Sequence, residues 1–184
     1  MVGLRRVFRA RLALARSSLA VATLAAIVIV LAPPARGGQS PTSADASLHI
    51  TGRVGHPLTL YLADLEQLPQ KITAVNDEKG AAVTYEGVAV AELLRQAGAP
   101  LGPQLRGPQM RLYVVVKASD GYQPVFALPE FDPAFTDRVI ILAYRRDGHA
   151  MALPEGPLRL IVPGEKRHAR WVREVTALEV EAAQ

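Results

Sequence analysis

The chain has 184 residues, with 21 Lys and Arg against 17 Asp and Glu, and it contains no cysteine. Six basic residues precede residue 38 and no acidic residue precedes Asp45, which leaves 15 basic and 17 acidic side chains in residues 38–184. A slightly acidic folded part argues against binding to nucleic-acid backbones, and the lack of cysteine excludes disulfides and thiolate metal sites.

Residues 1–37 have the composition of an export leader. Arginines without acidic residues fill residues 1–16, and residues 18–32 form an apolar run of 15 residues. A membrane-spanning helix needs about 20 apolar residues, whereas the core of a signal peptide needs roughly 7–15. We therefore predict a cleaved signal peptide, with an uncleaved N-terminal membrane anchor as the alternative. Either would place the rest of the chain in the periplasm or another extracytoplasmic compartment.

Residues 38–47 are small and polar, which predicts a short tether, so the folded domain is expected over residues 48–184. Helical spacing of apolar residues predicts a helix at 88–97 with Gly98 as its cap. Single helical turns or loops are expected at 64–69, 98–108 and 129–137. Alternating or β-branched residues predict strands at 48–54, 58–62, 72–75, 81–85, 112–117, 122–128, 139–143, 159–162 and 172–180. Many strands with few short helices indicate an α+β domain.

Most catalytic and metal-binding motifs are missing. The sequence has no phosphate loop, no nucleophile elbow of the G-x-S-x-G type and no H-E-x-x-H motif. The four histidines share no metal-ligand spacing, so we predict surface or turn histidines and no metal site.

The region of residues 157–171 is the strongest candidate for a site. A strand carrying Arg159 is followed by a turn and then by Lys166, Arg167, Arg170 and Trp171. Backbone amides of such a turn, ringed by cations, can hold an anion, and the indole can stack on a flat ring. The alternative is a solvated basic turn with the indole packed in the core.

A second candidate is the Asp-Gly-Tyr turn at residues 120–122. The Asp120 carboxylate can accept hydrogen bonds from the ring nitrogens of a ligand, although stabilising the turn itself is the commoner role of such a residue.

The order of several short motifs resembles the oxidoreductase molybdopterin-binding domain family, which has the sulfite-oxidase fold. The opening residues 52–60 resemble its G-x-V-x-x-P-x-x-L start, and residues 85–94 resemble its aromatic-x-G-V and L-L element. Residues 120–122 match its D-G-Y turn. Residues 142–148 resemble its L-A-Y-x-x-x-G stretch, residues 156–163 resemble its G-x-P-x-R-x-x-x-P element, and residues 167–171 resemble its R-x-x-K-W element.

The resemblance implies a sulfite-oxidase-like molybdopterin-binding fold, mostly β, with a pterin or molybdopterin-like ligand in a cleft. Carried over position by position, it implies that Tyr144 lies on the substrate side. The ligand-binding residues that it implies are Asp120, Tyr122, Arg159, Lys166, Arg167, Arg170 and Trp171.

One departure from the family pattern bears on the chemistry. In sulfite oxidases a cysteine before the aromatic-x-G-V element ligates molybdenum, but the matching residues 72–85 contain none. The chain is similar to small exported members without that cysteine, which bind a pterin and signal to a membrane partner. We therefore expect a non-catalytic pterin- or molybdopterin-binding or sensing module. One alternative is a molybdopterin-dependent oxidoreductase with a cysteine-free metal site, and another is an interaction module that has lost its ligand.

Overall fold

A computed structural model describes residues 46–184. The predicted signal peptide or anchor and nearly all of the predicted tether lie outside the described residues. Within residues 46–184 no helix has both the length and the apolar character needed to span a membrane.

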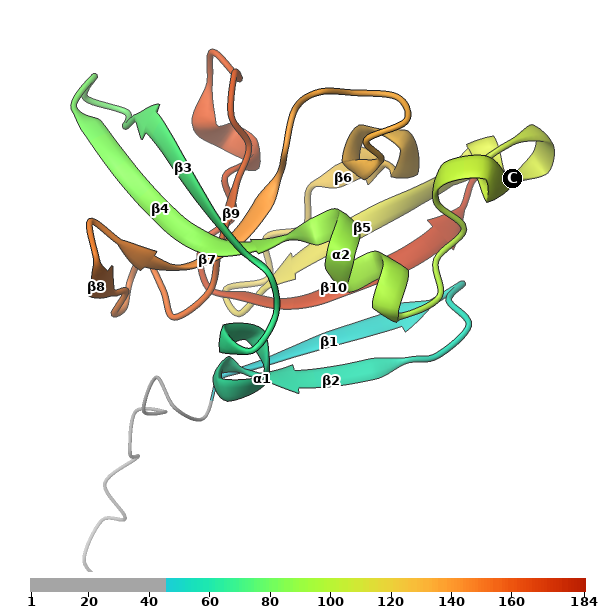
Figure 1. Cartoon of the computed structure of the whole chain (residues 1–184), viewed down its shortest axis with the longest axis horizontal. Coiled ribbons are helices and arrows are strands. Elements are labelled where there is room, and N and C mark those ends of the chain that lie inside the picture. Colours follow the sequence, from blue (N-terminus) through green and yellow to red (C-terminus); the bar gives the residue numbers. More distant parts are fainter. Residues whose placement is uncertain (1–45) are drawn as a thin grey trace, which may run out of the picture. The chain divides into compact units, whose positions relative to one another are not determined.

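The first of two sheets joins both ends of the described chain. Its strand order is β2 (Leu58–Tyr61), β1 (Ser47–Gly52), β10 (Val175–Ala182), β5 (Leu112–Ala118) and β6 (Val125–Ala127) (Figure 1). β1 and β2 form the predicted hairpin, and β1 then pairs in parallel with the C-terminal strand β10. Burial alternates regularly along β5, where every second residue from the first to the last is buried. This is the two-residue period of a strand with one face on the core.

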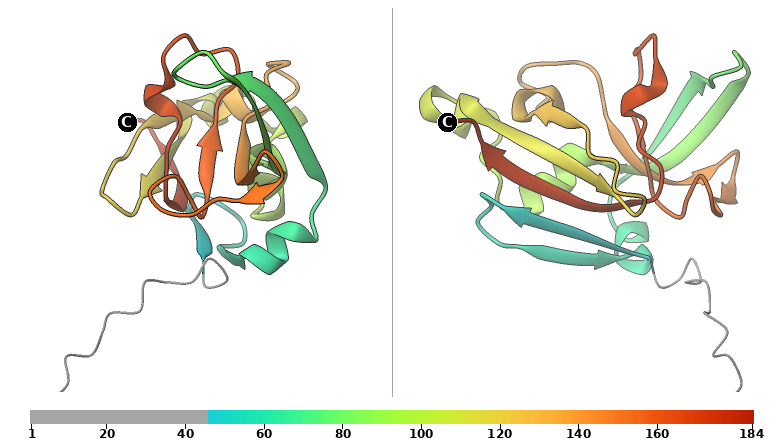
Figure 2. Two further views of the ribbon diagram at one scale, coloured as in Figure 1. Left: turned by 90° about the vertical axis from the view of Figure 1, so that its left-hand side faces the viewer. Right: turned by 180° about the vertical axis from the view of Figure 1, so that it is seen from behind.

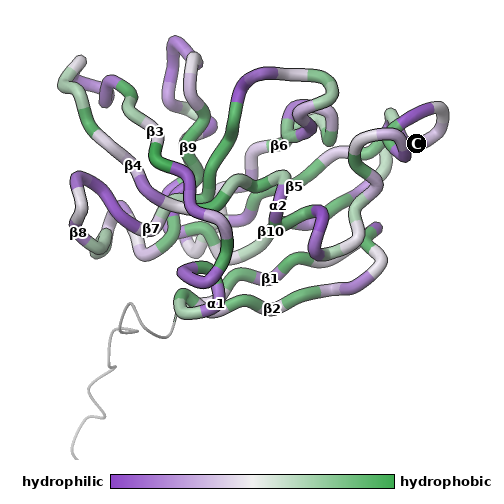
Figure 3. The backbone as a smooth tube through the Cα atoms, viewed as in Figure 1, coloured by the Kyte–Doolittle hydropathy of each residue, from purple (hydrophilic) through white to green (hydrophobic). Residues whose placement is uncertain are grey.

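The second sheet has the order β3 (Gln70–Asn76), β4 (Ala82–Ala89), β7 (Ile141–Arg146) and β8 (His149–Ala150). β9 (Arg159–Ile161) pairs antiparallel with β7. All of β9 and the first four residues of β7 are buried. The buried residues of β7 and the last two residues of β9 are apolar or aromatic, whereas β9 begins with the charged Arg159. In Figure 3 green is concentrated in the strands of the core, and purple is common in the loops, such as the one that contains η5.

A β-bulge bends β4 where it passes β7. The register shifts between Glu86 and Gly87, and a side chain at position 87 would place its Cβ 2.1 Å from the carbonyl oxygen of Leu142. Only glycine permits so close an approach of two backbones. This bend lets β4 begin in the second sheet and end at helix α2.

Two short α-helices, α1 (Leu62–Glu66) and α2 (Val90–Gln96), flank the sheets. α2 packs on the core through its apolar face, and Gly98 closes it with a φ of 76°, as its sequence predicts. Within residues 46–184 the remaining helical elements are the 3₁₀ turns η2 (Gly102–Gln104), η3 (Gly107–Arg111), η4 (Leu128–Phe131) and η5 (His168–Arg170).

The α+β fold class is confirmed, and the differences from the predicted elements are local. The predicted strand 122–128 is reduced to β6, because the backbone oxygen of Tyr122 accepts from the N–H of Ala118 and closes a turn. Residues 88 and 89 belong to β4 rather than to the helix. β8 was not predicted, since two residues are too few to show a period.

Candidate functional site

A cleft of about 520 Å³ lies between loops and strand ends of the two sheets. It is lined by the tip of the β3–β4 hairpin, the turn after β5, the end of β7 and the segment that contains η5. Both views of Figure 2 show that hairpin tip and the η5 segment projecting on the same side of the fold. The volume is in the range of small-molecule sites, which is roughly 300–1,000 Å³.

Arg159 enters the cleft from β9, in the centre of the fold. It is only 7 % exposed, and its Nη1 lies 3.3 Å from an Oε2 atom of Glu155. Its Nε is buried and has no hydrogen-bond partner. A buried donor without a partner is costly, and such groups in a cleft commonly face a ligand or a water. The sequence-predicted Arg159 is therefore a cleft residue with one unsatisfied buried donor.

Arg146 at the end of β7 connects two walls of the cleft. Its guanidinium lies 3.3 Å from Asp77 of the hairpin tip and 3.1 Å from Glu155. The hydrogen bond to Glu155 is the main cause that raises the pKa of Arg146. The N–H of Ala81 lowers the pKa of Asp77, with further lowering by Lys79 and Arg146. The hairpin tip is thereby fixed beside the cleft.

Trp171 is both a core residue and part of the cleft. It is 5 % exposed, and its Nε1 donates to the backbone oxygen of Val162 at 2.8 Å. His168 stacks on its indole, with 3.7 Å between ring centroids and 13° between planes. Tyr85 meets the same indole edge-on at 6.1 Å. The structure places the indole in the core, as the second sequence interpretation proposed, and stacking of a ligand on it stays a prediction.

The Asp-Gly-Tyr turn also lies in the cleft lining. An Oδ1 atom of Asp120 accepts from the backbone N–H of Tyr122 at 2.9 Å, so the carboxylate stabilises its own turn. The Tyr122 hydroxyl donates to the backbone oxygen of Ala169 at 2.8 Å, which joins this turn to η5. The ring of Tyr122 remains 47 % exposed and is available as a flat apolar face.

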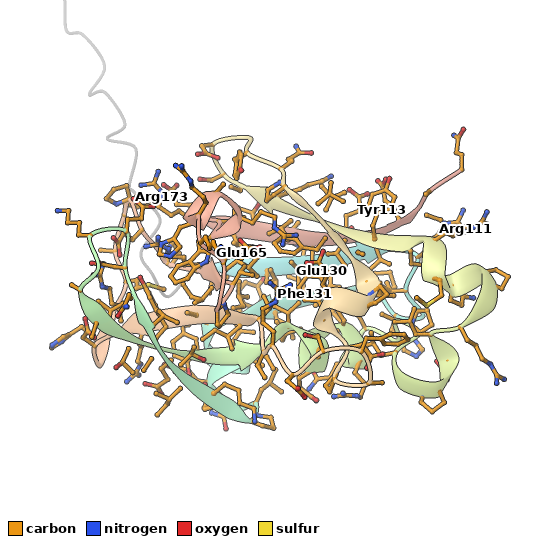
Figure 4. The ribbon with its side chains drawn as sticks, turned by 90° about the horizontal axis from the view of Figure 1, so that it is seen from above. Arg111, Tyr113, Glu130, Phe131, Glu165 and Arg173 are labelled. Carbon is orange, nitrogen blue, oxygen red and sulfur yellow. The ribbon has the colours of Figure 1, made fainter. Side chains whose placement is uncertain are left out.

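Arg170 is absent from the cleft lining. Its guanidinium pairs with Glu130 of η4 and with Glu165, and it lies 4.3 Å from the centroid of the Phe126 ring. Burial acts to lower its pKa, but the hydrogen bonds to both carboxylates outweigh that and raise it. Figure 4 shows Glu130 and Glu165 next to each other, one from η4 and one from the loop before η5.

Three further predicted residues also lie away from the cleft lining. Lys166 and Arg167 are exposed in the loop that leads to η5. Tyr144 is buried in β7, and its hydroxyl donates to Gln70 at 2.6 Å. The structure thus brings Asp120, Tyr122, Arg159 and Trp171 together in one cleft but not Tyr144, Lys166, Arg167 and Arg170. Contact of either set with a ligand stays a prediction.

The sequence prediction also missed residues that line the cleft. Tyr85 and Arg146 are direct cross-strand partners in the β4–β7 register, which no sequence pattern specifies. Lys79 belongs to a charged hairpin turn, whose position beside η5 depends on the tertiary fold. The only available signal was the unusual run of charges at residues 77–79. The other lining residues that were not predicted are Asp77, Glu78, Ala118, Glu155, His168, Ala169, Val172 and Arg173.

The residues of the cleft fit an organic ring with polar edges. The lining has four Lys and Arg and four Asp and Glu, together with the stacked pair of His168 and Trp171. Donors, acceptors and aromatic faces therefore occur side by side. The chain has no cysteine, so no thiolate of the protein can ligate a metal in this cleft.

Comparison with known proteins identifies the fold. The chain matches the oxidoreductase molybdopterin binding domain over residues 37–184. It also resembles a chain in the crystal structure of the sulfane dehydrogenase SoxCD from Paracoccus pantotrophus, with a TM-score of 0.61 and 22 % identity. That match covers 80 % of this chain but 41 % of the other. No curated protein matches. The chain belongs to the oxidoreductase molybdopterin-binding domain family.

Proposed function

We propose that this member of the family is an exported module that binds a pterin or a molybdopterin-like ligand and senses it without catalysing a reaction. The observation that carries the proposal is the buried Nε of Arg159, which has no partner although it belongs to a residue of the cleft. The family supports a molybdopterin-like ligand. The absence of any cysteine supports binding without catalysis, because the thiolate that tunes the metal in sulfite oxidases has no counterpart here.

In this proposal each cleft residue has a separate task. Arg159 donates a charge-assisted hydrogen bond to a ring oxygen or nitrogen, which contributes about 1.5–3 kcal/mol. The pterin ring would lie between the exposed face of Tyr122 and the stacked His168–Trp171 pair. Each well-placed stacking contact contributes about 0.5–1.5 kcal/mol to binding. Asp120 accepts from ring N–H groups. Molybdopterin, when it carries molybdenum, supplies redox chemistry at that metal, and none of these tasks depends on it.

Export and a partner form the second part of the proposal. Residues 1–37 support secretion or anchoring in the membrane, and the domain would then act in the periplasm. A sensing module of this kind needs a partner protein that receives its signal. A membrane-bound signalling protein would be accessible from the periplasm. Cell fractionation of the tagged full chain checks the location. Recovery of the protein only from the cytoplasm would contradict this part.

The ligand can be identified directly. The full chain, with its leader, is produced in a Gram-negative host and purified, and the protein is analysed for pterin by fluorescence and mass spectrometry and for molybdenum by elemental analysis. We expect about one pterin per chain and less than about one tenth of an equivalent of molybdenum. An empty protein that also ignores added reduced pterins would refute the proposal. Stoichiometric molybdenum would instead favour the oxidoreductase with a cysteine-free metal site.

Substitution of Arg159 tests whether its unpartnered Nε contacts the ligand. Arg159→Lys keeps the positive charge near Glu155 but removes the Nε donor, so we expect pterin affinity to fall about 10-fold to 100-fold. Arg138→Lys is the matched control, because the Nε of Arg138 is also buried without a partner but lies outside this cleft. Equal affinities of both variants and the wild type would show that the Arg159 donor does not contact the ligand.

A further inference from the structure

We propose that the cleft selects an uncharged pterin and discriminates against one that carries a phosphate, because the Glu155 carboxylate already occupies the anion position between Arg146 and Arg159. This inference rests on the proposed function and narrows its ligand class, because it keeps an uncharged pterin and excludes molybdopterin, which carries a phosphate. It differs from the simplest expectation for a basic cleft, in which the arginines would hold a phosphate.

The geometry places one carboxylate between two guanidinium groups. Both oxygens of Glu155 lie 3.1 Å from Nη1 of Arg146, and Oε2 lies 3.3 Å from Nη1 of Arg159. The two arginines come from β7 and β9, which are paired strands, so their positions are set by the sheet. Guanidinium groups that converge on one point are the usual means of holding a phosphate. Here the protein supplies that anion itself.

The remaining charges of the cleft do not restore an anion site. Arg146 has two further carboxylates within reach, Asp77 at 3.3 Å and Asp147 at 3.7 Å. The other cations of the lining, Lys79 and Arg173, are exposed, and two exposed carboxylates in the same lining offset them. A phosphate would therefore approach a balanced lining in which fixed carboxylates repel it.

An uncharged pterin can use the donors, acceptors and aromatic faces of the cleft that are not engaged in ion pairs. The buried Nε of Arg159 is a single donor without a partner, which matches one acceptor atom of a ring rather than the several oxygens of a phosphate. Asp120 offers an acceptor, and Tyr122 and His168 offer flat faces. The 2-amino-4-oxo-pyrimidine part of a pterin has adjacent donors and acceptors on its edge and needs no counter-charge.

The test compares two probes that differ only in the phosphate. Neopterin and its 3′-phosphate ester are titrated against the full chain at pH 7.5 and low salt. We expect the ester to bind at least about threefold more weakly than neopterin, and inorganic phosphate at 10 mM to leave neopterin bound. An ester that falls short of this threefold weakening, or displacement by phosphate, would overturn this inference alone. Failure of both probes to bind would overturn the proposed function with it.

A variant that removes the negative charge of Glu155 should raise the affinity for the phosphate ester. Glu155→Gln keeps the size of the side chain but frees the two arginines, so affinity for the phosphate ester should rise at least tenfold while neopterin changes less than threefold. Glu66→Gln is the matched control, because Glu66 pairs with Arg145 at 3.1 Å outside the cleft, and it should change neither affinity. If Glu155→Gln weakens both probes equally, Glu155 has only a structural role and the inference is wrong.

Discussion

The Arg170 guanidinium and the Glu130 carboxylate form a two-point ion pair, with Nη1 3.2 Å from Oε1 and Nη2 3.1 Å from Oε2. Glu165 accepts from Nε of the same arginine at 2.8 Å, and Arg138 lies 3.0 Å from Glu130. This cluster ties the η5 segment to η4. Because η5 carries His168 and precedes Trp171, the stacked pair in the cleft depends on an ion-pair cluster that lies outside it.

Removal of the Arg170 side chain should therefore lower the stability of the fold rather than remove a direct contact with the ligand. For Arg170→Ala we expect the free energy of unfolding, measured with urea, to fall by about 1–3 kcal/mol, because two partly buried carboxylates lose their partner. Arg145→Ala, which removes an exposed pair with Glu66, should cost less than about 1 kcal/mol. An Arg170→Ala protein of full stability that no longer binds pterin would show that Arg170 contacts the ligand directly.

Trp171 is the only tryptophan of the chain, and its indole lines the cleft. Its fluorescence should therefore report on ligand binding, and we expect a bound pterin to quench it as binding saturates. His168→Ala removes the stacked imidazole and should change the emission of the free protein. His149→Ala, an exposed residue outside this cleft, serves as control. Unchanged emission in His168→Ala would contradict the stacked arrangement.

Tyr85 should make stability sensitive to alkaline pH. Burial is the main cause that raises its pKa above the ordinary value near 10. A pKa raised in the folded state means that the contribution to stability is complete below the unfolded pKa and is lost as pH rises through the folded pKa. We expect the free energy of unfolding to fall above about pH 10. Tyr85→Phe should show a smaller fall between pH 10 and 11, and an equal fall would refute the role of Tyr85.

Tyr144 tests the substrate-side role that the family resemblance implies. Its hydroxyl donates to Gln70 and lies away from the cleft lining, so Tyr144→Phe should lose one partly buried hydrogen bond. We expect a destabilisation of about 0.5–1.5 kcal/mol and an unchanged affinity for neopterin. Tyr61→Phe, at an exposed position, should be neutral in both measurements. A drop in affinity without loss of stability would restore the ligand-facing role.

Local patterns determined much of this protein. The hairpin of β1 and β2, the alternation of β5 and the Gly98 cap of α2 follow from period and backbone preference, which act between residues close in sequence. The order of short motifs identified the family, and the missing cysteine limited the chemistry. Arg159 and the Asp-Gly-Tyr turn likewise stand out as candidate site residues from their local sequence alone.

Only the tertiary structure decided how the charges pair. Arg159 and Arg170 look alike in the sequence, eleven positions apart in one basic segment. In the fold, Arg159 is buried beside Glu155 in the cleft, whereas Arg170 pairs with Glu130 of η4, which is 40 positions away in the sequence. Ion pairs form between side chains that the sheets bring together, often from strands far apart in sequence. Sequence therefore specified which residues are charged, and the fold determined which of those charges remain available to a ligand.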